Sequence, residues 1–176
     1  MKIKFNPDIA YFTGLWKSRK IREGVGISGD SELQQIFVSE AIKTLGIPPE
    51  KIQVKEEKVF FYHSAYRKYL EKVADDELEI FKWRNSFSLN FVAGLFDGCG
   101  CVDVERGTVF FTKVSDADQL LMERLGLGFR RMGGRLYVAA RHVPTFGKLV
   151  LDALKREELK SRLSALMRSG NERDPR

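Results

Sequence analysis

Residues 92–100 read VAGLFDGCG, and this stretch decides the fold. Apolar residues recur at helical spacing through it and just before it: Leu89, Phe91, Val92, Leu95 and Phe96. Small residues recur at every fourth position: Asn90, Gly94 and Gly98. The first pattern predicts an amphipathic helix, and the second lets another helix backbone approach closely. We therefore expect this helix to pack tightly against a second helix.

The partner helix is predicted from a repeat at an offset of 80 residues. The matching pairs are Gly14-Leu15 with Gly94-Leu95, Leu45-Gly46 with Leu125-Gly126, Lys68 with Lys148, and Tyr66 with Phe146. Repeats at one fixed offset indicate a duplicated structural unit. We predict one unit over 8–87, a second over 88–168, and a flexible tail over 169–176.

The second unit has the signals of an α+β fold. A hairpin is expected over 101–114, with its turn at Arg106-Gly107, and a helix follows with Ser115 and Asp118 as a capping box. A second hairpin pairs 129–132 with 135–140 around Gly133-Gly134, and Pro144 begins the next helix, which is followed by a helical stretch over 155–167.

The first unit repeats this order with one clipped hairpin, because little chain lies between Lys20 and Ser31. A helix is predicted over 31–46, with Ser31 and Gln34 as its capping box. A hairpin over 51–63 and helices over 65–74 and 77–86 follow. We expect the two tryptophans, Trp16 and Trp83, to lie in the core.

Charge is concentrated in the second unit. The chain has 30 Lys and Arg against 24 Asp and Glu, a net charge of +6. No acidic residue lies between Glu123 and Asp152, a stretch with six basic residues: Arg124, Arg130, Arg131, Arg135, Arg141 and Lys148. Such a stretch is either a solvated basic face or a surface that contacts phosphates. The many ionic residues and few Asn and Gln favour a thermophilic source.

The stretch over 92–100 resembles the motif of the LAGLIDADG homing endonucleases and maturases, and 12–20 resembles it in a degenerate form. The resemblance implies two pseudo-symmetric αββαββα units that form a saddle on DNA. The units would pack through their motif helices, with Gly14, Leu15, Gly94, Leu95 and Gly98 at the interface.

In this family the last acid of each motif binds a divalent metal, but those two positions are Arg19 and Cys99 here. Neither residue type suits Mg²⁺. If cleavage survives, Asp97 and Asp103 are the candidate catalytic residues, with Glu105 nearby and Mg²⁺ as cofactor; otherwise we expect no metal or cofactor. A zinc site is disfavoured, because Cys99 and Cys101 lack a second pair and His63 and His142 stand alone.

The resemblance and the charge pattern together predict a nucleic-acid surface on the second hairpins. Its candidate residues are Arg19, Lys51, Gln53, Lys55, Lys58, Arg130, Arg131, Arg135, Tyr137 and Arg141. Arg19 would offset phosphate charge where a metal would otherwise sit.

We expect an intracellular monomer, in the cytoplasm or nucleoid, that binds nucleic acid without efficient cleavage. Duplex DNA is the expected partner and RNA is possible; no membrane partner is predicted, since no apolar run is long enough to span one. An active Mg²⁺-dependent endonuclease or nickase, an RNA-splicing maturase and a protein-interaction module remain alternatives.

Overall fold

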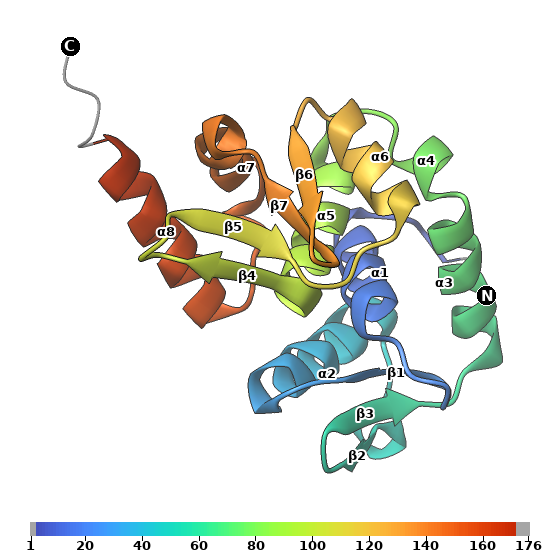
Figure 1. The fold of residues 1–176 in the computed structure, drawn as a ribbon. Coiled ribbons are helices and arrows are strands. Elements are labelled where there is room, and N and C mark those ends of the chain that lie inside the picture. Colours follow the sequence, from blue (N-terminus) through green and yellow to red (C-terminus); the bar gives the residue numbers. More distant parts are fainter. Residues whose placement is uncertain (1–2, 172–176) are drawn as a thin grey trace.

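Two helices lie side by side between the sheets of the molecule, α1 (Pro7–Arg19) and α5 (Ser86–Cys99) (Figure 1). The computed structural model describes residues 3–171. Each helix begins after an asparagine cap. The Asn6 side chain accepts a hydrogen bond from the backbone N–H of Ile9, and Asn85 forms a capping box with Ser88. These caps satisfy N–H groups that the helix itself leaves without partners.

Glycines set how closely the two helices approach. Gly14 lies against the backbone carbonyl of Phe91, and Gly94 lies reciprocally against that of Tyr11, so a methyl group at either position would collide with a carbonyl oxygen. Gly98 lies against the side chain of Ser18, which leaves no room for a methyl group there either. Leu15 and Leu95 are buried between the helices and the core. The structure therefore brings together the five residues predicted for the helix interface.

The second unit contains a four-stranded antiparallel sheet in the order β4-β5-β7-β6. Its strands are β4 (Gly100–Asp103), β5 (Thr108–Phe111), β6 (Phe129–Met132) and β7 (Arg135–Val138). Its helices are α6 (Asp116–Arg124), α7 (Val143–Val150) and α8 (Glu157–Asn171), with the 3₁₀ helix η2 (Ala140–His142) before α7. The predicted capping box of Ser115 and Asp118 is present at α6. Helix α8 lies beside β4 (Figure 1).

The first unit contains a three-stranded antiparallel sheet in the order β1-β3-β2. Its strands are β1 (Val25–Ser28), β2 (Gln53–Lys55) and β3 (Lys58–Phe61), and its helices are α2 (Ser31–Leu45), η1 (Pro49–Lys51), α3 (Ser64–Asp75) and α4 (Glu77–Ile80). Where the second unit has β4, the first has only an isolated bridge between Lys20 and Ile27. The predicted clipping of this hairpin is therefore correct.

The predicted fold class is confirmed: the chain is α+β, with two antiparallel sheets that are packed through the two motif helices. One buried apolar cluster runs through both units. Gly46 and Gly126 end α2 and α6 with φ of 65° and 91°, the left-handed conformation that glycine adopts most easily. Across residues 3–171, no helix is both long and apolar enough to cross a membrane.

Several predicted boundaries are wrong. Asp30 rather than Ser31 caps α2, because its carboxylate accepts from the backbone N–H of Leu33. The helix predicted over 77–86 ends at Ile80, because the chain must turn before Asn85 caps α5, and Trp83 in that turn is 68% exposed instead of buried. Trp16 is buried as predicted. Helix α8 continues to Asn171, so the predicted tail begins in helix, and 172–176 lie outside the described residues.

Candidate nucleic-acid interface

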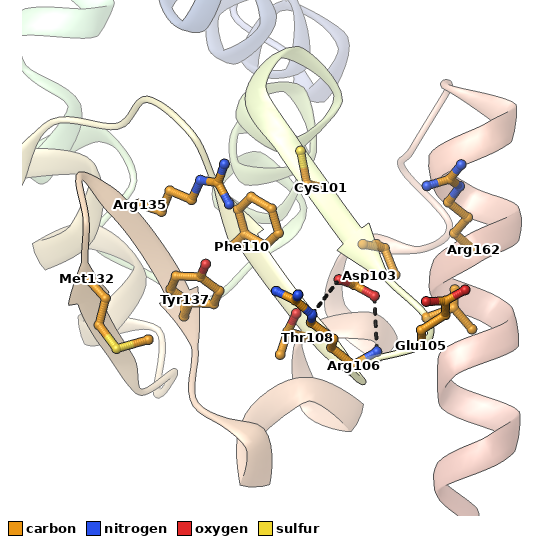
Figure 2. Close-up of a pocket in the computed structure, with 12 residues that line it drawn as sticks. Cys101, Asp103, Glu105, Arg106, Thr108, Phe110, Met132, Arg135, Tyr137 and Arg162 are labelled. Carbon is orange, nitrogen blue, oxygen red and sulfur yellow. Dashed lines mark hydrogen bonds and ion pairs between the residues drawn. The ribbon is translucent and has the colours of Figure 1, made fainter.

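The open face of the four-stranded sheet is formed by alternate residues of its strands. Strand register places Phe110 opposite Cys101 on one side and Tyr137 on the other, while Arg130 pairs with Tyr137 and Met132 with Arg135. Because side chains alternate between the faces of a sheet, these residues share one face with Asp103 and Thr108. Figure 2 shows this face, with Arg162 of α8 beyond the edge of β4.

A cation and two aromatic rings lie at the centre of this face. The Arg135 guanidinium carbon lies 4.9 Å from the ring centre of Phe110, and the Phe110 and Tyr137 rings are 5.0 Å apart. They line an open hollow of about 690 Å³ (Figure 2). Arginine above an aromatic ring keeps its charge and N–H donors for a phosphate or a guanine edge.

The sheet of the first unit offers a similar but more covered face. Gln53, Lys55 and Lys58 share it with Phe60, and the Lys55 nitrogen lies 5.5 Å from the Phe60 ring centre. Lys58 is held 3.1 Å from the carboxylate of Glu23. Phe60 is only 2% exposed, since Lys55 and Ile21 pack near it. Gln53 and Lys55 are therefore the exposed polar groups of this face that carry no carboxylate partner among the described residues.

Three predicted contact residues do not join these faces. Lys51 lies in η1 rather than on β2. Arg131 points to the opposite side of β6, where its guanidinium donates to Gln119 and Asp116 of α6. Arg141 lies in η2, because β7 ends at Val138 instead of continuing to residue 140. In the first and third cases the strand is shorter than predicted, and in the second the basic stretch alone does not distinguish the two sides of β6.

The ends of the two motif helices meet at Arg19 and Cys99. The Arg19 Nε atom donates to the carbonyl of Gly98 at 2.5 Å, so its guanidinium lies at the helix junction. The Cys99 thiol is buried and lies 3.2 Å from the carbonyls of Leu95 and Lys113. Burial raises the pKa of Cys99 to about 12, which keeps the thiol protonated. A protonated thiol and a guanidinium are not metal ligands.

Asp97, which is predicted as a catalytic residue only if cleavage survives, makes structural contacts in the fold. Its side chain is fully buried and accepts hydrogen bonds from the Tyr11 hydroxyl at 2.6 Å and from the backbone N–H of Lys155 at 2.7 Å and of Arg156 at 3.3 Å. Burial raises the pKa of Asp97 to about 6 against the effect of these donors. Its carboxylate fixes the segment that leads into α8 rather than facing either open sheet face.

Asp103 lies on the open face, but at the outer end of β4, about 10 Å along the strand from Gly100. Its carboxylate accepts from the backbone N–H of Arg106 at 3.0 Å (Figure 2). Glu105 follows in the hairpin turn and is exposed. Among residues 3–171, no group of three or more His, Cys, Asp or Glu side chains could hold a metal ion. The side chains present therefore do not fit the two-metal site of a cleaving enzyme.

Sequence reasoning missed a buried ionic cluster at the other motif helix. Lys17 donates to Glu77 at 2.5 Å and to Asp118 at 2.6 Å, so it joins α1 and α4 of the first unit to α6 of the second. Burial, and next the charge of Asp118, raise the pKa of Glu77 to about 7. Lys17 occupies the same place in its motif as Asp97 does in the other. The matching motif positions of Lys17 and Asp97 are the one sequence signal for this cluster, because Glu77 and Asp118 lie 60 and 101 residues from Lys17.

Comparison with known proteins settles the fold. No protein-family model and no curated protein matches the sequence. Solved structures of the homing endonuclease I-DmoI do match. A structure of its mesophilic variants is 18% identical, covers 83% of this chain and 96% of its own, and has a TM-score of 0.62. I-DmoI E117A in complex with its target DNA is 16% identical, covers 88% and 96% of the two chains, and has a TM-score of 0.61. The chain has the two-motif fold of this LAGLIDADG homing endonuclease.

Within this LAGLIDADG fold, the two motifs of the chain carry different residues at both acidic positions of the motif. The last acidic position of the motif is Arg19 in one unit and Cys99 in the other, and the preceding acidic position is Lys17 in one and Asp97 in the other. Lys17 contacts Glu77, which follows α3, and Asp97 contacts Lys155 and Arg156, which follow α7. Arg19 and Cys99 are the last residues of α1 and α5. The chain thus retains the LAGLIDADG helix pair while its junction carries a cation instead of two carboxylates.

Proposed function

We propose that this protein binds duplex DNA as a monomer, across the open faces of both sheets, and does not cleave it efficiently. The observation that carries the proposal is the helix junction. There, the Arg19 guanidinium and the protonated Cys99 thiol replace the carboxylates that hard metal ions require. A guanidinium at this place stabilises a phosphate by charge and hydrogen bonds, so binding needs no divalent cation.

The charge of the two faces supports DNA as the partner. Lys55 and Gln53 on one sheet, and Arg130 and Arg135 on the other, are exposed and stand on either side of the helix junction. The matched I-DmoI structures include complexes with DNA and Mn and with DNA and Ca. By analogy with these complexes, we infer that DNA is the partner of the open faces of this chain. Both units belong to one chain and share a buried helix pair, so a single copy would present the whole surface.

The central test is selection of bound sequences from a random duplex pool, with Mg²⁺ and with a chelator. We expect the same sequences to be enriched in both arms and to remain intact. Affinity measured by fluorescence anisotropy should fall steeply with salt, because each neutralised phosphate adds about −0.9 to the slope of log K against log salt. Mg²⁺-dependent nicking of the selected duplex would contradict the proposal, and so would a preference for RNA of the same sequence.

A triple variant tests the assigned surface. Changing Lys55, Arg130 and Arg135 to alanine should reduce the salt slope by about 2 to 3 and weaken binding at least tenfold. The matched control changes Lys43, Arg84 and Lys148, which are equally basic and exposed but lie off the two open faces. If the control variant loses as much affinity as the test variant, binding follows net charge rather than these faces.

A further inference from the structure

A second hollow lies at the end of β3, beside the sheet face that carries Lys58 and Phe60. It measures about 490 Å³ and is lined by Arg22, Gly24, Tyr62, His63, Ser64 and Arg67, together with Glu23. The residues come from the segment before β1, the segment after β3 and the first turns of α3. The helix pair gives these side chains no role, and among them Glu23 pairs with Lys58 of the adjacent sheet face.

One wall of the hollow is already rigid. Arg67 Nη1 donates to the backbone carbonyls of Arg22 at 2.9 Å and Gly24 at 3.2 Å, and its Nε pairs with Glu71 at 3.0 Å. Gly24 has φ of +50° and lies so close to the Phe61 carbonyl that no Cβ would fit. The segment 22–24 is therefore held in one shape, and the Arg67 guanidinium is fixed beside the hollow.

The lining groups are donors and aromatic rings. The exposed Arg22 side chain has no carboxylate partner among the described residues. His63 accepts from the Tyr66 backbone N–H through Nδ1 and lies 4.4 Å from the Tyr66 ring, which leaves Nε2 as its free ring nitrogen. The lone carboxylate, Glu23, is paired with Lys58. Tyr62 is 65% exposed, so its ring is accessible to a ligand in the hollow.

We propose that this hollow binds a nucleoside phosphate, with the phosphate between Arg22 and Arg67 and the base on the Tyr62 ring. Arginine forks match phosphate oxygens, and an exposed aromatic ring stacks any base. The volume lies within the range of small-ligand sites. The ligand is either a free nucleotide or a nucleotide of a strand that continues past the saddle. The site does not depend on duplex binding by the sheets.

The experiment is titration of the full chain with AMP, adenosine and inorganic phosphate, followed by ligand-observed NMR and calorimetry. AMP should bind at least tenfold more tightly than adenosine. Arg22→Ala should weaken AMP at least tenfold, and Arg22→Lys should restore part of the loss. Tyr62→Ala should weaken AMP but leave phosphate unchanged. Arg84→Ala, an exposed arginine elsewhere, should have no effect, and equal melting temperatures would show that all variants fold.

A second arm separates the two sources of the nucleotide. If a strand supplies it, Arg22→Ala weakens a duplex extended by a single-stranded overhang and leaves the blunt duplex unchanged. If a free nucleotide is the ligand, AMP binds and neither duplex responds. Either result supports the hollow as a nucleotide site. The proposal is overturned if AMP does not bind and neither duplex distinguishes Arg22→Ala from Arg84→Ala. AMP binding would stand even if the sheets bind no DNA.

Discussion

Glu77 is a buried carboxylate that controls how stability depends on pH. Its pKa is raised from 4.5 to about 7 by burial and by Asp118, so the folded state holds a proton that the unfolded state releases. Stability from this group is fully present below pH 4.5 and is lost as pH rises through about 7. We expect the melting temperature to be higher at pH 5 than at pH 8, and Glu77→Gln to reduce that difference.

The comparison with Glu77→Gln isolates this effect, since every other titrating group is the same in both proteins. Glutamine keeps an oxygen that accepts from Lys17 but carries no charge to bury. Should the variant show the same pH dependence as the parent, groups other than Glu77 would set it. A thermal melt followed by circular dichroism at the two pH values decides between these results.

Substitution of Asp97 tests whether its buried carboxylate stabilises the fold. Asp97→Ala leaves the Tyr11 hydroxyl and the N–H groups of Lys155 and Arg156 without their acceptor. Leaving several buried donors unpaired should cost about 3 kcal/mol of unfolding free energy, measured by denaturant titration. The affinity of the folded variant for DNA should change less than twofold. Unaltered stability would contradict the structural role.

At the scale of elements, we expect the contact between α1 and α5 to tolerate added side-chain volume least. Gly94→Ala puts a methyl group against the Tyr11 carbonyl, and neither backbone can retreat without separating the helices. We expect a loss of about 3 kcal/mol or more, in the range of severe overpacking. The matched control is Gly170→Ala in α8, where nothing lies within 4 Å, and which should gain up to about 1 kcal/mol from helix propensity.

The same helix pair shows what the sequence could predict. Small residues at every fourth position and glycines at helix ends have local physical causes, so α1, α5, the hairpin turns and the end of α2 are predictable. The partners of Lys17 are not, because Glu77 and Asp118 are 60 and 101 residues away. Strand alternation gives the open face of β7 at Arg135 and Tyr137 but does not show where that strand ends. The covering of Phe60 by Lys55 and Ile21 is a tertiary contact that strand alternation does not reveal.

At the scale of the whole molecule, the two units depend on each other through unequal contacts. Lys17 joins the first unit to Asp118 of the second. Arg156, in the segment fixed by Asp97, pairs with Glu32 at 3.1 Å and also with Asp30 at the start of α2. These ion pairs join the two units in addition to the helix pair. The surface that we propose for DNA spans both sheets, so it depends on the assembled pair and not on either unit alone.

Arg19 and Cys99 come from different units and meet at the helix junction. Substitutions there therefore test how the two units are assembled. Arg19→Asp with Cys99→Asp would place two carboxylates at neighbouring positions, where like charges repel and the buried one is costly. We expect this double variant to melt at a lower temperature than the parent and to regain stability when Mn²⁺ or Ca²⁺ is added, because carboxylate oxygens bind such ions.

The melting temperature of either single variant should rise less when these ions are added, and that of the parent should not change. A double variant that ignores divalent cations would show that the junction has lost the geometry of a metal site as well as its acids. In that case, restoring the two acidic side chains would not restore a metal site, because the backbone of the junction would hold them in the wrong places.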